Sequence, residues 1–218
     1  MPDLPTAHRK QIEAFLQKAT ARGRLAFVID ATMSREWAWD TATQLQAQMF
    51  EEAGKVGGLD VQLIYFRGTN ECSHSDWMSD ARELQRMMGR IRCEGGYTKY
   101  ARAFAYVRKE HERSPINAVV VVGDAMEESP GELYDAVAGL GAPFFLFQEG
   151  DLPEVTKCFK EMARLTNGAY ASFDPGSAKV LGELLRAVAA FATGGLTALA
   201  DQRTDSARKL LGQMKRSS

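Results

Sequence analysis

Short apolar runs rich in β-branched residues alternate along this chain with segments of helical periodicity, and this alternation constrains the fold more than any other feature. The runs are Leu25–Ile29, Val61–Phe66, Ala118–Val122, Phe144–Phe147 and, more weakly, Ala169–Phe173. Strands that alternate with helices are typical of βαβ units, whose strands pair in parallel. The sequence therefore predicts an α/β protein: a doubly wound, Rossmann-like three-layer sandwich with a mainly parallel six-strand sheet.

The segments between these runs carry helix signals. Apolar residues from Ala38 to Ala53 share one helical face, and Gly54 follows them. Ser129 precedes a proline and lies three residues before a glutamate, which is a helix start signal. Further helices are expected at about Pro5–Ala21, Asp80–Arg92, Lys99–Glu112, from Asp151 onward, and at about Leu196–Met214.

The domain organisation follows from the absence of a long linker. The only linker-like stretch is Thr193-Gly194-Gly195, which we expect to separate the last two helices. We predict a single domain over residues 1–218, with a core at about 24–192 and one additional helix at each end.

The charge and the cysteine content of the chain indicate which kinds of partner it can bind and in which cellular compartment we expect it. Lys and Arg number 27 and Asp and Glu 28, for a net charge of -1, so the whole chain lacks the basic excess typical of proteins that bind nucleic acid or anionic membranes. The three cysteines form neither a disulfide framework nor a zinc motif. The segment Met1–Gln11 is polar and no long apolar run follows, so we expect a cytoplasmic protein.

Polar side chains follow two of the predicted strands at the points where those strands end. Asp30 ends the first strand, with Thr32 and Ser34 in the turn behind it, and Asp124 ends the strand that starts at Ala118. Thr98 lies between them in sequence, in a Gly-Gly-Tyr-Thr loop before a helix. If the two strands are neighbours, their acids converge at the edge where open parallel sheets bind ligands.

The donor types at these positions favour a hard divalent cation. Two carboxylates repel each other unless a cation lies between them. Three hydroxyls and two carboxylates suit Mg²⁺ or Mn²⁺, whereas a zinc site would call for cysteine or histidine. Each of these residues taken alone is commonly a helix cap or turn residue. Helix capping does not require these residues to occur in this order along the chain, so their combination favours a common binding site.

At this point the sequence resembles the von Willebrand factor type A (vWA) domain family. That family carries a metal-ion-dependent adhesion site of the pattern D-x-S-x-S, a distant Thr and a distant Asp. The matching positions here are Asp30, Thr32, Ser34, Thr98 and Asp124. The order of strands and helices is similar from about Arg24 to Phe191. The resemblance also implies a short antiparallel edge strand within Asn70–Ser79.

The resemblance implies a binding function. The hydroxyls would hold a metal directly, the acids largely through water, and a carboxylate from a partner protein would fill the open position. Bacterial cytoplasmic relatives are often associated with AAA+ ATPases, so the resemblance implies such a partner. The site diverges slightly from the family pattern, with Thr32 in place of Ser, Met33 where Gly is frequent, and Ala125 where the family often has Gly.

The sequence is compatible with three functions. The leading hypothesis is a non-enzymatic interaction module that binds an Asp or Glu of a partner protein through Mg²⁺ or Mn²⁺. The first alternative is a doubly wound hydrolase or phosphoryl-transfer enzyme with Asp30 as nucleophile, although the sequence has no Walker A loop and no G-x-S-x-G elbow. The second is a vWA-like scaffold that binds no metal.

Overall fold

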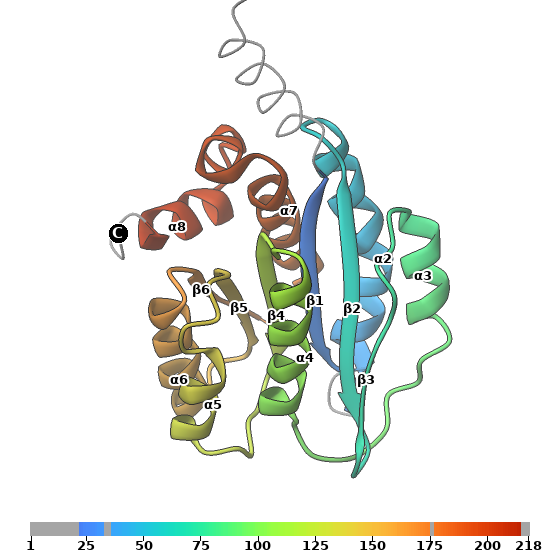
Figure 1. The fold of residues 1–218 in the computed structure, drawn as a ribbon, viewed down its shortest axis with the longest axis vertical. Helices are drawn as coiled ribbons and strands as arrows, with labels where there is room; N and C mark the ends of the chain where they lie inside the picture. Colours follow the sequence, from blue (N-terminus) through green and yellow to red (C-terminus); the bar gives the residue numbers. More distant parts are fainter. Residues whose placement is uncertain (1–21, 33–35, 175–176, 215–218) are drawn as a thin grey trace, which may run out of the picture.

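The computed structural model describes residues 22–32, 36–174 and 177–214 of the chain. Its centre is a six-stranded sheet of order β3-β2-β1-β4-β5-β6, with helices on both faces (Figure 1). This architecture confirms the predicted doubly wound sheet with six strands. The predicted helix at about 5–21 and the side chain of Ser34 lie outside the described residues.

The strands are mostly parallel. Their bounds are β1 Gly23–Asp30, β2 Leu59–Arg67, β3 Glu71–His74, β4 Ala118–Gly123, β5 Phe144–Glu149 and β6 Ala169–Phe173. Only β3 runs antiparallel to its neighbour β2, and it lies at one edge of the sheet. The short antiparallel edge strand implied by the vWA resemblance is therefore present. β1 and β4 are buried almost throughout because helices cover both of their faces.

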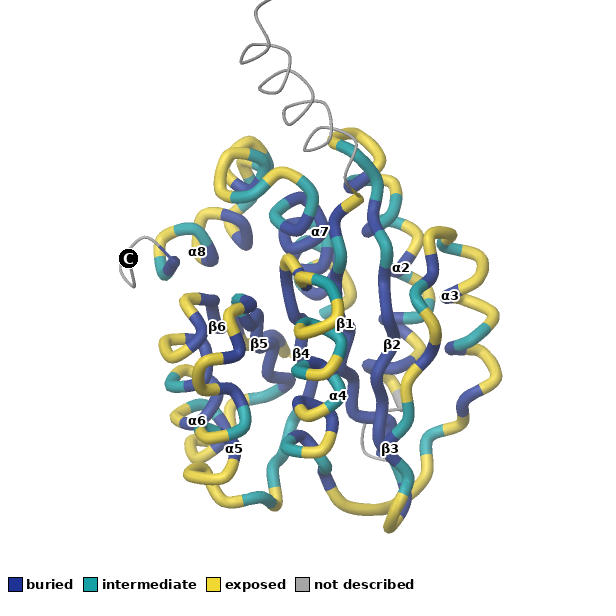
Figure 2. Tube along the Cα trace, in the orientation of Figure 1, coloured by how far each residue is buried: buried dark blue, intermediate teal, exposed yellow. Residues whose placement is uncertain are grey.

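The helices form the two outer layers. Their bounds are α2 Glu36–Gly54, α3 Ala81–Met88, α4 Tyr100–Arg113, α5 Pro130–Val137, α6 Pro153–Leu165, α7 Ala178–Asp201 and α8 Asp205–Met214. Helices α2, α3, α7 and α8 share one hydrophobic core with one face of the sheet. Helices α4, α5 and α6 share a second core with the other face. Figure 2 shows the buried strands between these layers.

Two helices differ from their predicted bounds. Helix α3 ends at Met88 rather than near Arg92, and Gly89 closes it by donating its backbone N–H to Gln85. The predicted helix at about 196–214 is not continuous. Gly195, in the predicted separator Thr193-Gly194-Gly195, is non-helical at φ 66° as expected. The predicted helix that follows it is divided between the end of α7 and α8, which begins only after Arg203 at φ 51°. Positive φ values break helical hydrogen bonding, so the C-terminal segment turns twice.

Helix α7 is long and apolar enough to cross a membrane by length and composition alone. Half of its most apolar window is buried inside the protein, where residues such as Leu181 and Leu185 contact the sheet. This burial is what a core helix of an α/β protein requires.

Candidate functional site

The two predicted strand-end acids lie on neighbouring strands. β1 and β4 pair in parallel, with Ile29 opposite Val122, so Asp30 and Asp124 both follow at the same edge of the sheet. From β1 the chain leaves through α2 on one face, and from β2 and β3 it reaches β4 through α4 on the other. The carboxyl ends of β1 and β4 therefore form the switch point at which doubly wound sheets bind ligands.

The turn after β1 is held by backbone hydrogen bonds. Asp30 is 1% exposed, and its Oδ1 accepts a hydrogen bond of 2.7 Å from the backbone N–H of Thr32. Ala31 donates its N–H to Phe66 O at 3.0 Å and accepts from Glu94 N at 3.1 Å. These bonds hold the Asp30 carboxylate at the carboxyl end of β1 and connect its turn to the loop that carries Thr98.

That loop packs closely against the turn after β2. A Cβ atom added to Gly96 would lie 2.0 Å from the carbonyl oxygen of Gly68, so only glycine fits at this position. Lys99 Nζ donates to the same Gly68 oxygen at 2.9 Å. The Gly-Gly-Tyr-Thr sequence thus allows a close approach that brings Thr98 to the site.

Two acids of the loop between β4 and α5 hold Thr98. Its Oγ1 donates to Glu128 Oε2 at 2.5 Å and accepts from the backbone N–H of Glu127 at 2.9 Å. Glu127 Oε2 accepts from Thr98 N at 2.7 Å, and Glu128 Oε1 accepts from Ala101 N at 3.3 Å. Together the two carboxylates cap the start of α4, whose own N-cap residue makes no side-chain cap.

These residues enclose a cavity of about 220 Å³. Its lining consists of Asp30, Thr32, Gly95, Gly96, Thr98, Asp124, Ala125 and Glu127. Four of the five predicted site residues therefore line one cavity, and the fifth, Ser34, lies outside the described residues. Asp30, Thr32 and Thr98 are all less than a tenth exposed, whereas Asp124 is half-buried and Glu127 is exposed.

The donor set fits an oxygen-binding cation. A hydroxyl has one proton and two lone pairs, so Thr98 Oγ1 keeps one lone pair after it donates to Glu128 and accepts from Glu127. In the described part of the chain, no group of three or more His, Cys, Asp and Glu side chains could hold a metal ion. A cation at this edge would therefore need hydroxyl ligands in addition to Asp30 and Asp124.

Glu127 and Glu128 were not predicted as part of the site. Glu127 lies three residues after Asp124 and Glu128 four, just before the helix start at Ser129. The sequence signal that could have indicated them is a pair of acids shortly after the end of a strand. Their contact with Thr98 depends on the packing of α4 beside α5, which local sequence does not specify.

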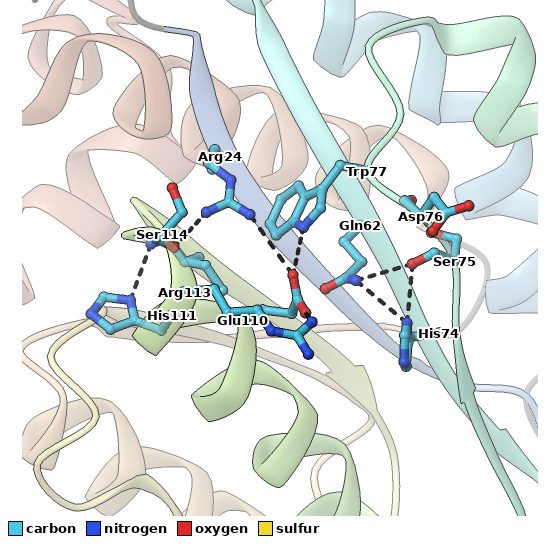
Figure 3. A network of polar contacts seen from close by, with 11 residues as sticks. Arg24, Gln62, His74, Ser75, Asp76, Trp77, Glu110, His111, Arg113 and Ser114 are labelled. Atoms are coloured by element: carbon cyan, nitrogen blue, oxygen red, sulfur yellow. Dashed lines mark hydrogen bonds and ion pairs between the residues drawn. The ribbon is translucent and has the colours of Figure 1, made fainter.

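A second polar cluster lies at the opposite end of β1. The Arg24 guanidinium lies over the Trp77 ring at 3.9 Å, and Trp77 Nε1 donates to Glu110 Oε2 at 2.9 Å (Figure 3). The Trp77 bond, with Arg113 and Arg24 nearby, holds the pKa of Glu110 below its usual value against the opposing effect of burial. This cluster joins β1, α4 and the segment after β3. Its side chains bond to one another across these elements and so stabilise the fold.

Two of the three cysteines, Cys72 and Cys158, are buried thiols. Burial raises the pKa of the Cys72 thiol and of the Cys158 thiol to about 11 each. Since the thiolate is the reactive form, both groups are almost entirely neutral thiols near neutral pH.

We expect Cys72 and Cys158 to resist alkylation in the folded protein. Iodoacetamide near neutral pH should label each about a hundredfold more slowly than in guanidinium-unfolded protein, because a pKa near 11 lowers the thiolate fraction and burial blocks access. Peptide mass spectrometry after timed labelling measures both rates. Rapid labelling of either residue without unfolding would contradict the packing around them.

Comparison with known proteins identifies the class of fold. No protein-family model matches the sequence, and no curated protein matches it in sequence. A von Willebrand factor type A protein from Catenulispora acidiphila is similar in structure, with a TM-score of 0.63 at 18% identity over 80% of this chain. The match spans 43% of that protein, so this chain corresponds to less than half its length.

Two further solved structures are similar over most of their own length. The SpRpn10 VWA domain has a TM-score of 0.58 at 13% identity, over 71% of this chain and 89% of that domain. An aerotolerance-related membrane protein from Bacteroides fragilis has a TM-score of 0.57 at 14% identity, over 75% and 96% of the two chains. This chain therefore has the vWA fold, as its motif order implied.

Proposed function

We propose that this protein is a protein-interaction module that binds a carboxylate of a partner through Mg²⁺ or Mn²⁺. The observation that carries this proposal is the convergence of Asp30, Thr32, Thr98 and Asp124 on one cavity at the switch point of a vWA fold. Ser34 completes the ligand set that the motif implies. The cation supplies a positive charge to which the partner's Asp or Glu can bind.

The residues of this chain hold the cation and leave one side open. In this proposal the Thr32 and Thr98 hydroxyls act as direct ligands, and Asp30 and Asp124, which line the same cavity, supply the negative charge that a divalent cation requires. Glu128 accepts a hydrogen bond from the Thr98 hydroxyl, which increases the electron density on the hydroxyl oxygen. Exposed Glu127 at the rim adds a third carboxylate to the lining.

The burial of Asp30 favours binding over catalysis. The ionisable groups among the described lining residues are carboxylates, which can act as a base or nucleophile, so the enzyme alternative rests on Asp30. Asp30, the nucleophile of the alternative enzyme hypothesis, is 1% exposed and is held by Thr32. Asp30-dependent hydrolysis of a phosphate or ester substrate by the purified protein would favour the enzyme instead.

The partner is a second protein that supplies an Asp or Glu side chain, and an AAA+ ATPase is the candidate that the family resemblance implies. We propose a cytoplasmic location, because Cys72 and Cys158 are buried thiols in a chain without a disulfide framework. Thiols of this kind are typical of proteins in a reducing compartment.

Partner capture should require the cation and the Thr98 hydroxyl. Immobilised protein should retain a partner from lysate in Mg²⁺ and release it in excess chelator, and Thr98→Ala should weaken capture because one ligand oxygen is lost. The stability loss should be about 1 kcal/mol, from the bonds to Glu127 and Glu128. Quantitative mass spectrometry of the eluates, with thermal melting of each variant, measures both effects.

Thr98→Ser is the matched control, since serine keeps the hydroxyl and should retain the partner. Capture that is equal in Mg²⁺ and in chelator, or equal for Thr98→Ala and wild type, would contradict a metal-mediated contact.

A further inference from the structure

A separate groove runs along the outer edge of the sheet at β6, between α6 and α8. Its volume is about 990 Å³. Its lining includes Lys157, Lys160 and Arg164 from α6, Tyr170 and Ser172 from β6, and Lys209 and Gln213 from α8. None of its lining residues belongs to the candidate metal site.

The groove is basic although the chain as a whole is nearly neutral. Four cationic side chains line it, against the single carboxylate of Asp151. Arg164 is paired with Glu161 at 2.6 Å, and Lys160 lies 5.3 Å from the centre of the Tyr170 ring. Lys157 on α6 and Lys209 on α8 line opposite sides of the groove, and both are exposed. A ligand in the groove would therefore lie between positive charges.

The floor of the groove is a sheet edge. β6 pairs with β5 on one side only, so its other side ends the sheet. The backbone N–H and C=O of Tyr170 point toward this edge, because both bond to the Gln213 side chain. Backbone groups alternate in direction along a strand, so those of Ser172 point the same way. An exposed edge of this kind can pair with an added strand.

The Gln213 side chain already makes strand-like hydrogen bonds to this edge at one position, Tyr170. Its Oε1 accepts from Tyr170 N at 2.9 Å, and its Nε2 donates to Tyr170 O at 2.8 Å. One amide side chain thus makes the two hydrogen bonds that the N–H and C=O of one residue in an antiparallel neighbouring strand would make. This contact protects the edge in the isolated protein and can be exchanged for backbone bonds at little enthalpic cost.

We propose that the β6 edge groove binds an extended acidic segment of another protein by strand addition. The segment pairs with Ser172 and displaces Gln213 from Tyr170, while its acidic side chains approach Lys157, Lys160 and Lys209. Backbone pairing gives the affinity and the flanking lysines give the preference for acidic sequences. This contact needs no metal and is independent of Asp30.

A synthetic probe tests this proposal on the full chain. The probe is a fluorescein-labelled peptide of alternating Glu and Val, and its control carries prolines at the central Val positions, which removes backbone donors. Fluorescence anisotropy should show binding of the Glu-Val peptide that weakens as salt rises, and at least about tenfold weaker binding of the proline peptide. Chelator should change neither result.

Variants separate the groove from general charge effects. The double variant Lys157→Glu with Lys209→Glu should weaken binding by about tenfold or more, since two attractions become repulsions. The matched control is Lys109→Glu with Lys179→Glu, which makes the same charge change at exposed lysines of α4 and α7 and should leave binding unchanged. Gln213→Ala should tighten binding several-fold by removing the internal competitor.

Hydrogen exchange locates the contact without any variant. The Ser172 amide should become protected when the Glu-Val peptide is added. The proposal is overturned if wild type does not bind the peptide at about 1 mM, if the proline peptide binds equally, or if Gln213→Ala weakens binding. Protection of Ser172 that rises with protein concentration alone would mean that a second copy of this chain covers the edge.

Discussion

Gly123→Ala is expected to lower the free energy of unfolding by about 3 kcal/mol. An added Cβ would lie 1.7 Å from the Tyr100 hydroxyl oxygen, and Tyr100 is fully buried with its ring edge-on to Phe66 at 4.9 Å and to Phe159 at 5.8 Å. The aromatic cluster leaves the ring little room to move, so β4 must shift. Chemical denaturation of both proteins measures the difference.

Gly131→Ala is the matched control, because its added Cβ meets nothing within 4 Å in α5. That variant should be neutral or more stable by up to about 1 kcal/mol. Tyr100→Phe in the Gly123→Ala background should recover part of the loss, since it removes the atom that clashes. Equal stability of Gly123→Ala and Gly131→Ala would contradict the packing of Tyr100 against the strand end.

The sheet and the position of the candidate site were predictable because their determinants are local. A run such as Ala118–Val122 is apolar on both faces, which indicates a central parallel strand, and a residue that ends such a strand must lie at the sheet edge. Asp30 and Asp124 were placed at that edge by these rules alone. Thr98 was a candidate from its Gly-Gly-Tyr-Thr loop before a helix, and the order of the vWA motif then matched it to the same site as the two acids.

The missed features depend on contacts between distant segments. Glu127 and Glu128 reach Thr98 across 29 and 30 residues, and Gln213 reaches Tyr170 across 43. The break at Gly195 was predicted from the Thr-Gly-Gly stretch, but the second break, at Arg203, arises from backbone angles that α7 and α8 adopt as they pack on the sheet and on each other. Periodicity predicts which face of a helix is apolar, but not where the helix must bend.

Asp30→Asn is expected to lower the affinity for Mn²⁺ by about a hundredfold or more, because it removes one of the negative charges beside the cation. Asparagine keeps an oxygen that can accept from Thr32 N, so the turn after β1 is retained and the fold should be preserved. Asp30→Ala should lose the same affinity and the turn bond in addition. Asp135→Asn, at an exposed position in α5, is the control for the change in net charge.

Calorimetric titration of Mn²⁺ in the presence of excess acetate tests the central claim most directly. Acetate stands for the partner carboxylate, so the site is measured with its open position filled. We expect one binding event for wild type and for Asp135→Asn, and none at the same concentrations for Asp30→Asn. Absence of binding by wild type, or equal binding by Asp30→Asn, would contradict a metal-mediated carboxylate site at this edge of the sheet.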